Sequence, residues 1–95
     1  MTEQPVIGEA SVPRFPRGVR LQYNAQRQHW MVQAPERVFI PDEVALAVLQ
    51  RVDGRTSISA MVDTLARDYA APREVIRDDV LELLRDLARK GVITA

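Results

Sequence analysis

Few residues of this chain could take part in catalysis, and the sequence places none of them in a catalytic arrangement. His29 is the only histidine, and neither a base partner nor a set of companion ligands accompanies it. Asp78 and Asp79 are adjacent, but consecutive helical side chains point about 100° apart, so the two carboxylates cannot share one proton. We interpret His29 as a partly exposed strand residue and the two aspartates as part of a solvated helix face.

The serines and glycines lack the neighbours that nucleophilic or phosphate-binding chemistry requires. Ser57 and Ser59 have no accompanying histidine or lysine, and capping of a helix explains Ser57. The four glycines are isolated from one another, so the chain has no Gly-rich phosphate loop. We therefore expect no catalytic residue, no metal site and no cofactor, which disfavours a small enzyme.

Composition argues against several other classes of protein. Ninety-five residues suffice for one small domain, and the absence of cysteine excludes disulfides and suits the cytoplasm. Thirteen basic residues balance thirteen acidic ones, so no overall field attracts nucleic acid or an anionic membrane. The start MTEQPVIGEA does not resemble a signal peptide, and no window approaches the roughly 20 apolar residues of a membrane span. We expect a cytoplasmic protein with neither a nucleic-acid nor a membrane partner.

Alternation of apolar and polar residues predicts a three-stranded meander. Residues 19–23 and 30–34 alternate with period two, and the polar stretch 24–28 between them has the length of a hairpin loop. Arg37-Val38-Phe39-Ile40 forms a short third strand, which Pro41 ends. A strand that proline stops belongs at the edge of a sheet, where its outer backbone groups stay open to another chain.

The first part of the chain shows no such periodicity. Residues 1–17 contain three prolines and no apolar face. We expect them to form a flexible N-terminal arm that precedes a domain at residues 18–95, with residues 1–12 dispensable for folding.

Three helices account for the remainder. Asp42 and Ser57 are good N-caps, and Pro72 fits the first turn of a helix. Gly54 and Gly91 are natural terminators of the first and the last helix. The order βββααα predicts a winged-helix-like α+β domain, in which the helices cover one face of the sheet.

On a helical wheel the last helix has two different flanks. Its core stripe comprises Ile76, Val80, Leu83 and Leu87. One flank is basic and apolar and comprises Arg73, Arg77, Leu81, Leu84 and Ala88. The other is largely acidic and comprises Val75, Asp79, Glu82 and Asp86. The helix either has a wide apolar stripe with scattered surface charge, or its basic flank is one wall of a groove for an extended, acidic partner.

Four ordered stretches resemble the PqqD family of pyrroloquinoline quinone (PQQ) biosynthesis. They are "PRFPRGVRLQYN", "WMVQAPERVFIPDEVALAVLQRVDGRTS", "MVDTLARDY" and "PREVIRDDVLELLRDLARKGVI", and they cover nearly all of the chain except its first dozen residues. One departure is Ala60, where relatives often carry an acid that would complete a capping box with Ser57. Its loss weakens a helix start by about 1 kcal/mol at most and leaves the implied function unchanged.

The resemblance implies a peptide chaperone rather than an enzyme. Proteins of this family bind the ribosomally made precursor peptide PqqA and present it to the radical SAM enzyme PqqE, which crosslinks a glutamate and a tyrosine of the peptide. In similar recognition domains the leader peptide adds a strand to the sheet edge and lies against the third helix. The implied peptide-binding residues are Arg37, Val38, Phe39, Ile40, Arg73, Ile76, Arg77, Val80, Leu81 and Leu84.

A winged-helix nucleic-acid-binding domain is the alternative function. The zero net charge argues against it, and so do the five acids of the last helix, which would repel phosphates. We expect a monomer, with a domain-swapped dimer as the alternative that the open sheet edge allows.

Overall fold

The alternating residues of the first half of the chain pair into one antiparallel sheet in the computed structural model, which describes residues 6–95. Its strands are β1 (Arg20–Asn24), β2 (His29–Ala34) and β3 (Arg37–Phe39), in that spatial order. The central strand is therefore β2, and β1 and β3 are the two edges. Ile40, which we expected in the third strand, lies just outside β3 and directly before Pro41.

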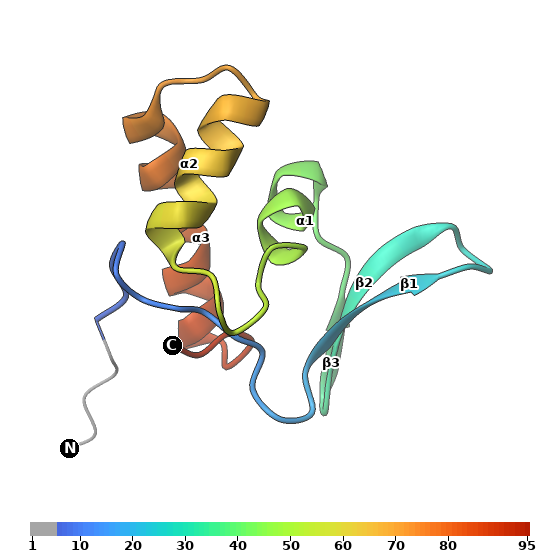
Figure 1. Cartoon of the computed structure of the whole chain (residues 1–95). Coiled ribbons are helices and arrows are strands. Elements are labelled where there is room, and N and C mark those ends of the chain that lie inside the picture. The colour runs from blue at the N-terminus through green and yellow to red at the C-terminus, as the bar shows by residue number, and fades with distance from the viewer. Residues whose placement is uncertain (1–5) are drawn as a thin grey trace.

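One face of the sheet contributes to the core. Leu21 pairs with Val32, and Val32 pairs with Phe39, so the three side chains share a face. Val32 is fully buried, whereas the tip of the hairpin projects beyond the helices (Figure 1). Tyr23 and Trp30 pair edge to face near that tip, with ring centroids 5.5 Å apart.

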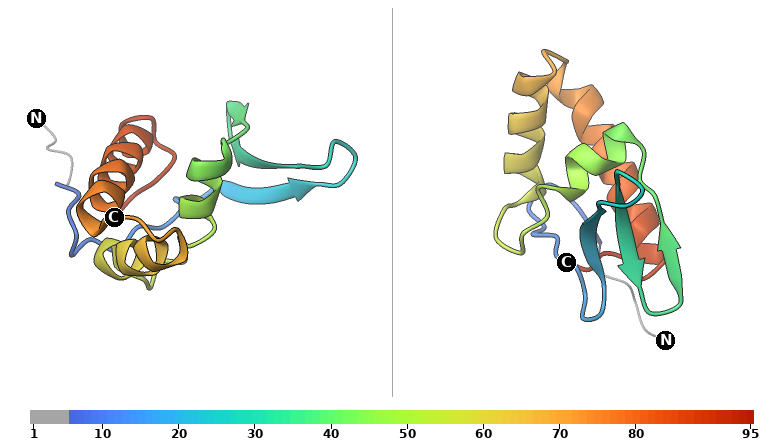
Figure 2. Two further views of the ribbon diagram at one scale, coloured as in Figure 1. Left: turned by 90° about the horizontal axis from the view of Figure 1, so that it is seen from above. Right: turned by 90° about the vertical axis from the view of Figure 1, so that its right-hand side faces the viewer.

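Three helices follow the sheet, which confirms the predicted order βββααα. They are α1 (Glu43–Leu49), α2 (Ile58–Asp68) and α3 (Arg73–Arg89). Seen from above, α1 lies between the sheet and the α2–α3 pair (Figure 2). The helix α1 therefore connects the two halves of the domain.

The predicted N-caps are confirmed. Asp42 Oδ1 accepts a hydrogen bond from the Ala45 N–H at 2.8 Å, and Ser57 Oγ accepts one from the Ala60 N–H at 3.1 Å. Each bond satisfies a backbone donor that has no partner within its own helix.

The first helix ends earlier than its apolar pattern suggested, at Leu49 instead of just before Asp53. The Asp53 carboxylate accepts from the backbone N–H groups of Arg55 and Thr56, at 2.8 Å each. These hydrogen bonds lower the pKa of Asp53, and the bond from Arg55 has the largest effect. The turn that they close redirects the chain into α2.

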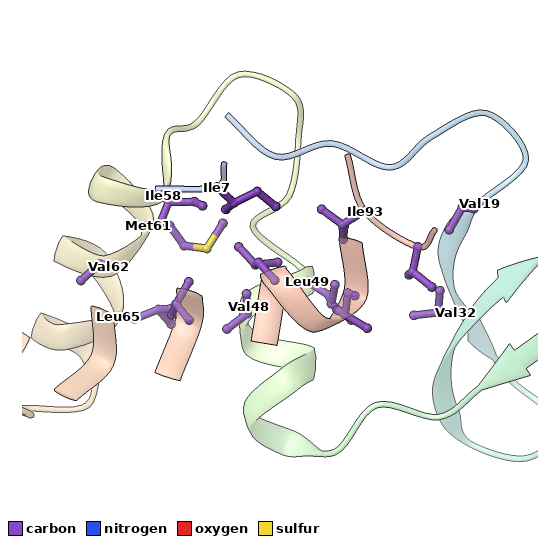
Figure 3. Packing of buried hydrophobic residues seen from close by; sticks show 14 residues of the cluster. Ile7, Val19, Val32, Val48, Leu49, Ile58, Met61, Val62, Leu65 and Ile93 are labelled. Atoms are coloured by element: carbon purple, nitrogen blue, oxygen red, sulfur yellow. The ribbon is translucent and has the colours of Figure 1, made fainter. Parts of the chain in front are cut away.

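Most of the core lies among the three helices and the two ends of the chain, and β2 adds the buried Val32 from the sheet (Figure 3). From α3 it takes Val80, Leu84 and Leu87, whereas Ile76 and Leu83 are only partly buried. The buried stripe of α3 is thus rotated toward the flank that we expected to be a binding wall, because α2 and the N-terminal residues pack on that flank.

The N-terminal segment, residues 7–15, is part of the domain, which differs from the expected flexible arm. The N–H of Ile58 donates to the Ser11 carbonyl at 2.9 Å, and the N–H of Ser59 donates to the Glu9 carbonyl at 2.8 Å. The segment therefore satisfies two of the unpaired donors at the start of α2. Residues 1–5 of the expected arm lie outside the described residues.

Both ends of the N-terminal segment are fixed as well. The Arg85 guanidinium donates twice to the Ile7 carbonyl, at 2.7 and 3.0 Å, and the Ile7 side chain is buried in the core. Arg14 and Thr94 exchange backbone hydrogen bonds of 2.8 and 3.0 Å. A domain boundary at residue 18 would separate Ile7 from the core in which it packs.

We expect Ile7→Ala to lower the free energy of unfolding by about 2 to 3 kcal/mol, because it leaves a cavity in the core. Val6→Ala is the matched control, since the side chain of Val6 is 90% exposed and its truncation should be neutral. Urea denaturation followed by circular dichroism measures both. Equal stability of the two variants would show that the segment is a flexible arm after all.

Gly91 follows α3 with φ at +77°, and a Cβ added there would meet no atom within 4 Å. Gly91→Val should therefore cost on the order of 1 kcal/mol or more, from backbone strain alone. Gly8→Val is the control, because Gly8 also has open space around it but no positive φ. A neutral Gly91→Val in thermal denaturation would contradict this assignment.

Candidate peptide-binding site

The outer edge of β3 is open. Within the described residues β3 pairs only with β2, so its other side keeps backbone donors and acceptors that no strand satisfies. Figure 2 (right) shows β3 at the outer side of the sheet. The side chains of Val38 and Ile40 are 52% and 60% exposed, which leaves apolar surface along this edge.

A hollow of about 270 Å³ opens between the three helices, close to where the chain leaves the β3 edge and enters α1. Its lining is mainly apolar and comprises Val44, Ala45, Ala47 and Val48 from α1, Leu65 and Tyr69 from the end of α2, and Ile76, Val80 and Leu83 from α3. Two carboxylates complete it, Asp42 and Asp79. The face of α3 that looks toward α1 is therefore apolar with an acidic border.

Of the six residues expected to form the α3 wall, Ile76 and Val80 line this hollow. Arg73 does not. Its guanidinium pairs with Asp63 of α2 at 2.5 Å and with Glu9 of the N-terminal segment at 2.6 Å. The hydrogen bonds to Asp63 and then to Glu9 raise the pKa of Arg73, so the side chain is a cation already held by two carboxylates.

The other three residues of the expected wall also lie away from the hollow. Arg77 is paired with its neighbour Asp78 at 3.1 Å. Leu81 lines a separate, shallower depression that it shares with Arg85, and Leu84 is fully buried. The structure thus brings Ile76 and Val80 toward α1 and turns the basic flank toward α2 and the N-terminal segment.

Sequence reasoning missed the two carboxylates of the hollow. Asp42 was assigned only its role as an N-cap, and Asp79 was placed on the flank opposite the expected wall. A helical wheel gives the angle between side chains but does not say which neighbour each flank faces. The exposed Val44, two residues after the N-cap Asp42, is the signal that could have located the hollow.

The described part of the chain offers little for other chemistry. Within residues 6–95 no group of three or more histidines, aspartates and glutamates could hold a metal ion. No helix in this range combines the length and the apolar character needed to cross a membrane. His29 Nδ1 lies 3.3 Å from the carbonyl oxygen of Trp30, a contact within the strand.

Comparison with known proteins identifies the family. The sequence profile of "Coenzyme PQQ synthesis protein D (PqqD)" matches residues 29–93. The chain belongs to the PqqD family. A "PqqA binding protein" of Bradyrhizobium diazoefficiens is 49% identical over 93% of this chain and 85% of its own length. One of Gluconobacter oxydans is 45% identical over 98% of both chains.

Two solved PqqD structures support the fold. One is the solution NMR structure of the PqqD truncation of Methylobacterium extorquens PqqCD, described as a functional and stand-alone RiPP recognition element. It is 40% identical, has a TM-score of 0.79, and the match covers 94% of this chain and 95% of that one. The crystal structure of PqqD from Xanthomonas campestris is 42% identical, with a TM-score of 0.55 and coverage of 88% and 93%.

Proposed function

We propose that this PqqD-family chain is a peptide chaperone of PQQ biosynthesis, which binds the precursor peptide PqqA and does not itself catalyse a reaction. The observation that carries the proposal is the open β3 edge, found in a chain whose relatives are named PqqA binding proteins. The bound peptide is then presented to the radical SAM enzyme PqqE, which crosslinks a glutamate and a tyrosine of the peptide.

Strand addition is the proposed mode of binding. A peptide that pairs with residues 37–40 satisfies the open backbone groups of the edge with little demand on its own sequence. The exposed Val38 and Ile40, two residues apart, offer apolar contact on one face of the new strand. Ordering of a flexible peptide opposes these gains and limits the net affinity.

We propose that Ile76 and Val80 receive apolar side chains of the peptide, because both line the hollow. Binding along Arg73, Arg77, Leu81 and Leu84, which the family resemblance implies, is the competing hypothesis for the path of the peptide. Their flank of α3 already contacts α2 and the N-terminal segment.

The cellular compartment in which this protein acts follows from the origin of the peptide. A ribosomally made precursor is released into the cytoplasm, where we place this protein. We propose that it works as a monomer, because a peptide that adds to β3 needs that edge free. A swapped dimer that pairs through the edge is the competing state.

Titration of isotope-labelled protein with PqqA tests the mode of binding. We expect amide shifts at residues 37–40, while the amides of residues 58–61, at the start of α2 and outside the lining of the hollow, change little. Replacing successive peptide N–H groups by N-methyl groups should weaken binding at every second position, because only alternate N–H groups of a strand face its neighbour. Unshifted β3 amides, or losses without this alternation, would rule out strand addition.

Arg77→Glu tests the basic flank. Because Arg77 lies away from the hollow and is paired with Asp78, we expect the affinity for PqqA to change less than about twofold. A loss of roughly five- to thirty-fold, equivalent to about 1 to 2 kcal/mol, would instead place the peptide along Arg73 and Arg77. Isothermal titration with PqqA measures the difference.

A further inference from the structure

The hollow between the helices is large enough for a single bulky side chain. An apolar cavity of about 150 Å³ accommodates benzene, and this hollow has about 270 Å³. All three helices contribute apolar lining, and two large residues of that lining stay exposed, Val44 at 65% and Tyr69 at 57%. Surface of this kind, apolar and concave, is typical of a binding site rather than of a solvated face.

The charged residues that line the hollow restrict the kind of ligand that it can bind. Asp42 and Asp79 line the hollow, and no lysine or arginine does. Within residues 6–95 neither carboxylate forms an ion pair, and Asp42 only accepts the capping bond from the Ala45 N–H. Asp86, on the same flank of α3, is different because Lys90 and Arg89 neutralise it. A cation beside the hollow would therefore meet two unpaired carboxylates.

The hollow also continues the edge of β3. The exposed residues Val38, Ile40 and Val44 lead from the edge strand to the start of α1. Asp42 lies on this path and lines the hollow itself. A peptide strand on β3 that extends past Ile40 thus brings its next residues to the mouth of the hollow.

We propose that the hollow is a specificity pocket for one bulky apolar side chain of PqqA, and that Asp42 and Asp79 pair with a basic residue of PqqA close to that side chain. The proposal rests on the proposed function, since it takes the peptide on β3 as the occupant. In this proposal the backbone groups of the β3 edge provide most of the affinity, and the hollow distinguishes one peptide from another. The proposal also predicts that the segment of PqqA at the hollow is basic, whereas the basic flank of α3 led us to expect an acidic segment.

Ala45→Leu tests the pocket by filling it, since Ala45 is a lining residue. Ala60→Leu adds the same volume at an exposed position of α2 and is the matched control. We expect Ala45→Leu to weaken PqqA binding at least tenfold and Ala60→Leu to leave it within twofold. Truncation of one bulky apolar residue of PqqA to alanine should lower its affinity for the wild-type protein by the same factor of about ten. The same truncation should not lower the affinity for the Ala45→Leu variant any further, because the pocket is already filled.

A charge test does not depend on how well the filled variant folds. Asp42→Asn keeps the helix cap, because asparagine caps as well as aspartate, and removes only the charge. Combined with Asp79→Asn it should reduce the affinity for PqqA roughly three- to ten-fold and flatten its salt dependence. Asp78→Asn is the control, because Asp78 is adjacent in sequence but does not line the hollow.

The outcomes separate this proposal from the proposed function. If Ala45→Leu and the double asparagine variant bind PqqA as the wild type does, while β3 amides still shift, the pocket is wrong and strand addition stands. If PqqA shifts no β3 amide in the wild type, the proposed function is wrong, and the pocket proposal that rests on it is wrong as well. If Ala45→Leu changes the sedimentation coefficient but not PqqA binding, the hollow is an interface between copies of the chain, which also overturns the pocket.

Discussion

The first N–H groups of α2 have no acceptors within their own helix, and the carbonyls of Ser11 and Glu9 supply them. Much of the rest of the domain depends on this contact. It fixes the N-terminal segment across α2 and α3, where Ile7 enters the core and Arg73 meets Glu9. The basic flank of α3 is thereby occupied from within the chain. The face toward α1 stays free for a ligand, and this asymmetry defines the candidate site.

Such a domain recognises a peptide in two ways, through hydrogen bonds to its backbone and through contacts with its side chains. The edge of β3 offers hydrogen bonds that any extended chain can use, so it cannot choose among peptides by itself. Selection requires a feature that favours one particular side chain, and the hollow is such a feature. Its acidic border adds a preference that acts at longer range, because opposite charges also steer the encounter.

The sequence predicted those parts of the fold that follow local rules. Alternation located β1 and β2, and the short polar side chains of Asp42 and Ser57 located two helix starts. The N-terminal segment escaped prediction because backbone hydrogen bonds and isolated buried residues such as Ile7 and Pro13 hold it, and neither leaves an apolar period in the sequence. The orientation of α3 also escaped, because Leu84 is buried by neighbours that are distant in the sequence. For the same reason Asp79 could be placed on a flank but not beside the hollow.

The contact between Arg85 and the Ile7 carbonyl joins residues 78 positions apart. The bridge between Arg14 and Thr94 spans a similar stretch of chain. During translation the N-terminal segment is therefore made long before its partners, and the loops that these contacts close are long, which slows folding. The β1–β2 hairpin can form on the emerging chain, but the helical core must wait until residues 85–94 have left the ribosome. Until then Ile7 lacks the complete core in which it packs.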